Sequence, residues 1–134
     1  LALILLLDQF PRHIYRGQRE AFAGDHRAAT LAVEGVSRQM HCKLPLCAQV
    51  FFLMPLMHAE DEDLQDLCLK SMTDLLERAP VSCRDSVRSS VNAAKQHQEL
   101  IGRFGRFPHR NRALGRDSTA EELRFLENSS GFGQ

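Results

Sequence analysis

The chain has 134 residues, of which 43% are hydrophobic and 25% are charged. These fractions match an average globular protein and exclude a collagen-like, low-complexity or fully disordered chain. The 17 basic and 17 acidic side chains balance to zero net charge, which excludes a chain-wide basic field for nucleic acid or anionic lipid. This length predicts one domain, which we place at residues 1–127, with a flexible tail at 128–134.

The chain opens with seven apolar residues, Leu1 to Leu7, directly before Asp8. A membrane-spanning helix needs about 20, and the run has neither the basic residues before it nor the cleavage site after it that mark a secretion signal. No membrane association is therefore predicted. The run is typical of a buried helix whose beginning has been removed, so we expect an N-terminal part to be missing. Pro11 is expected to end this helix, because proline disfavours helical geometry in the residue before it.

The next two expected helices form the middle of the chain. Asp25 is expected to cap the first of them, and its apolar residues lie on one face from Ala29 to Met40. The second, at about 46–57, is apolar on all sides, which predicts a central, buried position. Pro55 lies inside this helix and is expected to kink or end it.

Acidic residues at 60–63 precede a further helix with one apolar face, and Pro80 closes it. Ser82 and Asp85 resemble a capping box for a fifth helix that runs to about residue 102, and Ser118 with Glu121 resembles another for a short last helix. The periodicity is helical nearly everywhere. The sequence therefore predicts an all-α fold of about six helices packed as antiparallel pairs.

The four cysteines lie 5, 21 and 15 residues apart, and these spacings match no zinc-ribbon pattern. Cys47 and Cys68 fall on apolar helical stripes, where a free thiol packs as a small hydrophobic group. We therefore expect reduced thiols rather than disulfides, which favours a cytoplasmic protein.

The segment 103–116 is the least generic part of the chain. It contains no acid, and Phe104 and Phe107 alternate with its five arginines: Arg103, Arg106, Arg110, Arg112 and Arg116. Guanidinium groups suit carboxylates and phosphates, which favours an anion-binding loop. Alternatively, the phenylalanines fill the core and the arginines pair with the acids at 60–66. Nucleic acid is the least favoured partner, because the chain as a whole is neutral.

Two further groups of polar residues could carry chemistry. His58 and Glu60 follow the buried central helix, and together with His97 and His109 they could converge as acid–base groups or metal ligands. Because no two histidines show the four-residue spacing of a helical metal site, no metal is predicted. Asp8 follows an apolar run and needs a partner if it is buried. Arg12 or an arginine of 103–116 could supply an internal ion pair, or Asp8 could orient a group in a shared cleft.

These groups together carry a resemblance to a known family. The matching residues are 5–12 (LLLDQFPR), 14–17 (IYRG), 21–23 and 25, then 55–61 (PLMHAED), then 97, 103–111 (RFGRFPHRN), 114–116, 118–122 (STAEE) and 125–126. The chain resembles the uncharacterised bacterial-type family called domain of unknown function 924. The resemblance implies a tetratricopeptide-like arrangement of packed helix pairs and a further N-terminal segment. It implies no reaction.

From these observations the sequence predicts a cleft between helices that binds a small anionic ligand. Whether the same cleft also carries out acid–base catalysis is left open by the sequence. The candidate ligand-binding residues are Asp8, Arg12, Arg103, Arg106, Arg110 and Asn111. The candidate catalytic residues are His58, Glu60, His97 and His109. No cofactor is assigned. The alternative is a helical protein–protein interaction module in which the same polar residues form internal ion pairs.

Overall fold

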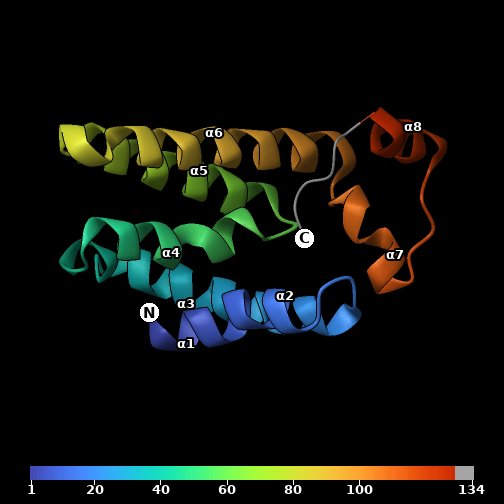
Figure 1. Ribbon diagram of the computed structural model, residues 1–134, viewed down its shortest axis with the longest axis horizontal. Helices are drawn as coiled ribbons and strands as arrows, with labels where there is room; N and C mark the ends of the chain where they lie inside the picture. The colour runs from blue at the N-terminus through green and yellow to red at the C-terminus, as the bar shows by residue number, and fades with distance from the viewer. Residues whose placement is uncertain (129–134) are drawn as a thin grey trace.

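The computed structural model describes residues 1–128 and contains no strand among them, so the predicted all-α class is confirmed (Figure 1). Consecutive long helices pack side by side as antiparallel neighbours, with α3 against α4, α4 against α5, and α5 against α6. The long helices are α3 (Asp25–Ser37), α4 (Leu46–Met57), α5 (Glu62–Arg78) and α6 (Val81–Phe104). The N-terminal segment covers the opposite side of α3, so the helices form a layered stack.

Shorter elements complete the chain. They are α1 (Ala2–Ile4), η1 (Leu5–Gln9), α2 (Phe10–Ile14), η2 (Arg19–Phe22), η3 (His41–Lys43), η4 (Pro108–Arg110), α7 (Asn111–Leu114) and α8 (Ala120–Asn128). In Figure 1, η4, α7 and α8 lie near the end of α6, on the same side as the end of α2. The segment at residues 108–114 therefore lies within reach of the residues that follow α2, and Arg19 donates to the Leu114 carbonyl at 3.1 Å.

The first helix does not end before Pro11, contrary to the prediction. α1, η1 and α2 run on without a break to Ile14, and η1 is a π-helical turn in which Phe10 N–H donates to the Leu5 carbonyl five residues back. Proline clashes with the preceding α-helical turn and offers no N–H. The wider π turn directly before Pro11 accommodates both defects.

Asp25 does not cap α3, since Gly24 occupies the capping position and Asp25 begins the helix with no side-chain cap. Gly24 is required there, because a Cβ atom would lie 2.3 Å from the Leu7 carbonyl oxygen. The close crossing of α3 and the first helical segment therefore leaves the Asp25 carboxylate available for another partner.

Two other capping predictions also need correction. α6 begins at Val81 after Pro80 and has no side-chain cap, so the Ser82–Asp85 box does not form. The cap of α8 is shifted by one residue from the predicted pair. Thr119 Oγ1 accepts from Glu122 N–H at 3.2 Å, and Glu122 Oε2 accepts from Thr119 N–H at 2.7 Å. Adjacent Ser118 offers the same chemistry as Thr119, so the local sequence does not distinguish the two caps.

The main core lies between α3, α4, α5 and α6. Its fully buried side chains include Ala32, Leu53, Leu56, Cys68, Met72 and Ala94. α4 is central, as predicted, although Phe51 on its outer side is 42% exposed. A smaller core joins the end of α6 to the 103–116 segment through Ile101 and Phe107, and Phe107 is fully buried.

All four cysteines are free, with Cys68 buried in the core and its pKa raised to about 12 by that burial. Cys47 is exposed, contrary to the prediction, because it lies in the first turn of α4 and outside its buried face. No helix within residues 1–128 is long and apolar enough to cross a membrane. Of the predicted tail, residues 129–134 lie outside the described residues, and Asn128 ends α8.

Candidate functional site

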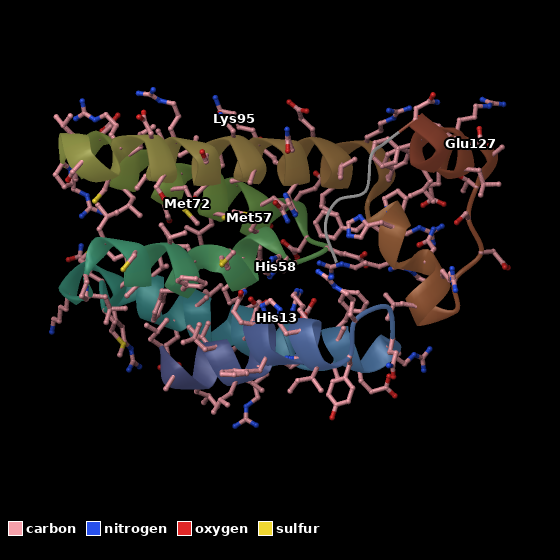
Figure 2. All side chains as sticks on the ribbon, viewed as in Figure 1. His13, Met57, His58, Met72, Lys95 and Glu127 are labelled. Carbon is pink, nitrogen blue, oxygen red and sulfur yellow. The ribbon has the colours of Figure 1, made fainter. Side chains whose placement is uncertain are left out.

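Residues from the three motifs meet where the first helical segment, the end of α4 and η4 approach one another. In Figure 2, His58 lies at the end of α4, close to the first helical segment that carries His13. Asp8 and Arg12 come from η1 and α2, and Arg110 comes from η4. The tertiary fold therefore unites polar residues that are up to 102 positions apart in the chain.

Asp8 is fully buried and has three side-chain partners. Its Oδ1 atom lies 2.7 Å from His58 Nδ1 and 3.0 Å from Arg12 Nη1, and its Oδ2 atom accepts from Gln9. Burial alone would raise the pKa of Asp8. The hydrogen bond from His58 and the positive charge of Arg12 outweigh that effect and leave the pKa below its ordinary value. Asp8 is therefore ionised at neutral pH.

His58 is the imidazole partner of this carboxylate. Burial lowers the pKa of His58 below 6.5, and nearby Arg12 and Arg110 act in the same direction, although the bond to Asp8 opposes them. A neutral imidazole that is hydrogen-bonded to a carboxylate carries its proton on the bonded nitrogen. His58 therefore donates through Nδ1–H and keeps a lone pair on Nε2.

Asp25 joins two arginines that are far apart in the sequence. Arg12 binds it through two parallel hydrogen bonds of 2.8 Å, and Arg110 Nη1 lies 3.2 Å from Oδ2. Arg110 also lies between two aromatic rings, with its guanidinium carbon 4.8 Å from the centre of the Phe22 ring and 4.4 Å from that of Phe107. Such stacking holds the guanidinium in one plane.

Arg110 is the most deeply buried cation of the group, with a side chain only 6% exposed. Burial lowers its pKa to about 10 even though Asp25 favours the charged form. Its Nε atom is buried and has no hydrogen-bond partner within residues 1–128. A buried charged group with an unused donor is uncommon and points to a further polar partner.

His97 and His109 also lie in this region, as the sequence suggested. The rings of His58 and His97 are 6.4 Å apart, and Phe107 packs against both His97 and His109 at 5.3 and 5.5 Å. Burial and the charge of Arg110 lower the pKa of each of these two histidines to about 4. Both are therefore neutral at physiological pH. His97 Nδ1 donates to the Ala93 carbonyl at 2.8 Å.

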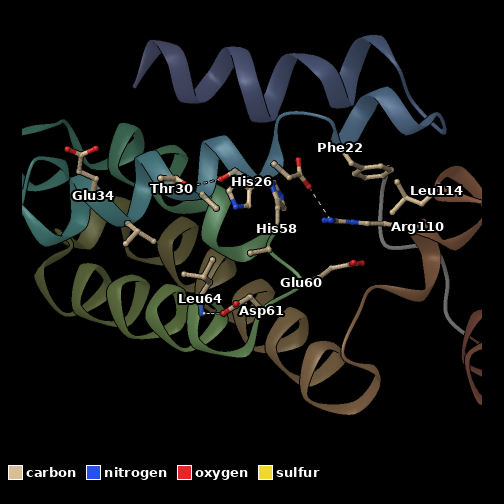
Figure 3. Close-up of a pocket in the computed structure, with 14 residues that line it drawn as sticks. Phe22, His26, Thr30, Glu34, His58, Glu60, Asp61, Leu64, Arg110 and Leu114 are labelled. Carbon is tan, nitrogen blue, oxygen red and sulfur yellow. Dashed lines mark hydrogen bonds and ion pairs between the residues drawn. The ribbon is translucent and has the colours of Figure 1, made fainter. Parts of the chain in front are cut away.

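Two cavities lie on either side of this cluster, and Phe22, His58 and Arg110 line both. The larger one is a cleft of about 730 Å³ between α3 and the α4–α5 connection, shown in Figure 3. Apolar side chains form much of its wall: Phe22, Ala29, Val33, Leu64 and Leu114. The smaller cavity, of about 250 Å³, is lined by Arg12, His97 and His109 among others. An apolar wall with a few convergent polar groups is the usual form of a small-molecule site.

Glu60 borders the larger cleft, but its carboxylate is fully engaged. Arg116 binds it through bonds of 2.6 and 2.9 Å, and the Phe107 N–H donates to it at 2.8 Å. Burial would raise the pKa of Glu60, but Arg116 and the Phe107 N–H outweigh it and lower the pKa. Glu60 thus anchors the 103–116 segment as a bound anion.

Three of the candidate ligand-binding residues, Arg103, Arg106 and Asn111, line neither cavity. Arg106 binds Glu122 through bonds of 2.6 and 2.8 Å, and buried Asn111 donates to the same carboxylate. Arg103 pairs with Glu121 at the surface. The geometry thus separates Arg12 and Arg110, which line the cavities, and Asp8, which is buried behind them against Arg12 and His58, from Arg103, Arg106 and Asn111 at the α6–α8 corner.

No group of three or more His, Cys, Asp or Glu side chains within residues 1–128 is arranged to hold a metal ion.

Two residues of the candidate site, Phe22 and Asp25, are not among those that the sequence predicts for it. The sequence predicts a helix cap for Asp25 and no role for Phe22 beyond its place in the family motif. Their signal lay in the motif itself, because residues 21–25 form part of the family pattern.

The family described as "Bacterial protein of unknown function (DUF924)" matches residues 1–130. The chain belongs to this family. A solved structure of a protein of unknown function from Agrobacterium tumefaciens is similar, with 36% sequence identity and a TM-score of 0.81. The similarity covers 96% of this chain and 66% of that protein, so the chain spans less than two thirds of its length. No curated protein matches the sequence. The tetratricopeptide-like placement stays a prediction.

Proposed function

We propose that this DUF924 member binds a small amphipathic anion, such as an organic carboxylate, in the cleft of about 730 Å³. The observation that carries the proposal is the state of Arg110. Its guanidinium borders both cavities, is held flat between Phe22 and Phe107, and leaves Nε–H without a partner within residues 1–128. A carboxylate at the part of the guanidinium that borders the cleft would add a charge-assisted hydrogen bond, which is among the stronger ones in proteins.

The shape of the cleft supports an amphipathic ligand over a small inorganic ion. Arg110 lies at one end of the cleft and Glu34 at the other (Figure 3), and apolar residues such as Val33 and Leu64 are also among those that line it. A volume of about 730 Å³ falls in the range of sites that hold organic molecules of moderate size. The apolar part of the ligand would gain free energy by leaving water.

The test uses hexanoate as the probe. Two partial probes are compared with it: acetate, which lacks the apolar chain, and hexan-1-ol, which lacks the charge. Calorimetric titration measures binding in every variant, and the side-chain Nε–H signal of Arg110 is followed by NMR in the wild type. We expect hexanoate to shift this signal and to bind more tightly than either partial probe. Arg110→Met should weaken hexanoate binding by about tenfold or more, because a charged hydrogen bond is lost. Arg103→Met is the matched control and should leave binding unchanged. Equal binding by wild type and Arg110→Met would contradict the proposal.

A second candidate function is protein–protein interaction. The outer face of the first helical segment exposes Leu3, Leu6, Phe10 and Ile14, each more than 40% exposed. A continuous apolar face of this kind is typical of a contact surface. Sedimentation analysis of wild type and Phe10→Glu tests whether copies of the chain associate through it. An unchanged monomer in both would count against self-association.

A further inference from the structure

The paired side chains of Asp8 and His58 form the most specific chemical arrangement in the molecule. The carboxylate is wholly buried in the π turn of the first helical segment, and His58 follows the last turn of α4. The 2.7 Å contact between Oδ1 and Nδ1 fixes the orientation of the ring. A carboxylate that holds one ring nitrogen of histidine leaves the other as a directed proton acceptor.

The second ring nitrogen of His58, Nε2, is not bonded to Asp8. Nε2 has no hydrogen-bond partner in the part of the chain that the structure describes, and the His58 side chain is 13% exposed. Both cavities are lined by His58. The two nitrogens lie on opposite sides of the ring, so the hydrogen bond to Asp8 directs Nε2 away from that buried carboxylate.

We propose that His58 is a general base that accepts a proton at Nε2 from a substrate bound in the larger cleft. Asp8 is the positioning residue that fixes the tautomer and stabilises the imidazolium that forms. This inference rests on the proposed function, since the molecule that gives up the proton is the anion bound in the cleft. The bond between the proton and its donor atom on the substrate breaks, its electron pair stays on the substrate, and the proton ends on Nε2.

The neighbouring groups favour proton transfer over nucleophilic catalysis. The Thr30 hydroxyl, which also lines the cleft, donates to the His26 carbonyl at 2.9 Å. Glu60 is occupied by Arg116 and the Phe107 N–H. Arg110 lies beside the same cleft as His58 and can stabilise negative charge left on a deprotonated substrate. The arrangement therefore combines an oriented base with a fixed cation.

The test uses 5-nitrobenzisoxazole, a neutral planar molecule whose decomposition reports on a base in an apolar site. The base removes the proton on the ring carbon, the electron pair forms a nitrile, the N–O bond breaks, and a coloured phenolate leaves. We expect wild type to accelerate this reaction above the buffer rate. His58→Gln should abolish the acceleration, since a general base contributes about a hundredfold or more. His26→Gln is the matched control, because His26 lines the same cleft but is exposed.

Asp8→Asn tests the positioning role and keeps the shape of the side chain. We expect a rate at least about tenfold lower and a pH–rate midpoint moved to lower pH, because the charge of Asp8 favours protonated His58, whereas Arg12 and Arg110 oppose it. A purely structural pair would lower the melting temperature and leave the midpoint of the folded protein unmoved. NMR of the ring nitrogens gives a second reading at pH 7. Wild type should show His58 protonated on Nδ1 and bare on Nε2.

Several outcomes would overturn the proposal: no acceleration by folded wild type, equal rates in wild type and His58→Gln, or a proton on Nε2. These failures are distinct from failure of the proposed function. The isoxazole probe carries no charge and needs no bond to Arg110, whereas hexanoate binding is measured without any reaction. If hexanoate binds but the isoxazole reaction is not accelerated, the assignment of His58 as a base is wrong. If the reaction is accelerated but hexanoate does not bind, the proposed anion site is wrong.

Discussion

Two arginine–carboxylate networks of this protein use the same residue types for different purposes. At the α6–α8 corner, Glu122 is bound by Arg106, Asn111 and the Thr119 N–H, and the network lines neither cavity. At the cavities, Arg110 shares Asp25 with Arg12 and retains a donor without a partner within residues 1–128. A closed network stabilises the fold, while an incompletely bonded one beside a cleft can bind a ligand.

The two networks also differ in how their charges are balanced. Glu122 has a pKa lowered to about 2, chiefly by the hydrogen bonds from Arg106, so it remains ionised over the physiological range. The cavity cluster contains the neutral histidines His97 and His109, whose pKa values are lowered to about 4 by burial. Proton binding therefore affects the two regions in different pH ranges.

The largest expected effect comes from removing the carboxylate at the centre of the cavity cluster. Asp8→Ala leaves His58 and Arg12 without their buried partner, and we expect it to lower the free energy of unfolding by about 3 kcal/mol. Urea denaturation measures this change. Asp8→Asn keeps the shape and part of the hydrogen bonding, so it should cost clearly less. Equal losses in the two variants would contradict this expectation and would mean that the lost charge alone, and not packing, accounts for the effect of Asp8.

The next effect is the pH dependence of stability, which separates the two networks. The folded-state pKa of His97 and of His109 lies below the usual 6.5, so the unfolded chain takes up protons first as the pH falls. Stability should decline between pH 6.5 and about 4, by about 2 kcal/mol in total after allowance for partial solvent screening. Denaturation at a series of pH values measures it. The double variant His97→Gln/His109→Gln should show a smaller change of stability over this pH range. An unaltered pH dependence would refute the assignment of the decline to these two histidines.

Glu122→Ala is expected to cost about 1.5 kcal/mol, since it removes the α8 cap and one partner of buried Asn111. The loss should be smaller than for Asp8→Ala, because Arg106 can turn to water. The stabilisation by Glu122 is complete above its unfolded pKa of about 4.5 and is lost as the pH falls toward about 2. Thermal denaturation at pH 7 and pH 3 therefore measures a smaller difference between wild type and Glu122→Ala at the lower pH.

The smallest effect belongs to the surface pair of Arg103 and Glu121, whose side chains are both more than half exposed. Arg103→Ala should change the free energy of unfolding by less than about 0.5 kcal/mol, because water and salt screen such pairs. Thermal denaturation in low and high salt measures it. A loss above 1 kcal/mol would show that the α6–α8 corner depends on this pair.

Much of the fold follows from local patterns in the sequence. The apolar face of α5 and its close at Pro80 depend on residues within a few turns of one another, and so does the cap of α5 by Asp61. Two predictions failed for different reasons. Pro11 is tolerated inside a helix because a local π turn precedes it. Asp25 does not cap α3, and its carboxylate binds the distant side chains of Arg12 and Arg110.

The candidate site was predictable as a set of residues but not as an arrangement. The sequence by itself determined an all-α protein, because helix formation depends on short-range patterns, and it marked Asp8 and the arginine-rich segment 103–116 as groups that need an oppositely charged partner or a ligand. Only the tertiary structure decided that Arg110 pairs with Asp25, 85 positions away, and Arg116 with Glu60, 56 positions away. Arginines are chemically alike in sequence, and only packing determines which of them a carboxylate reaches and which retains a donor beside a cavity.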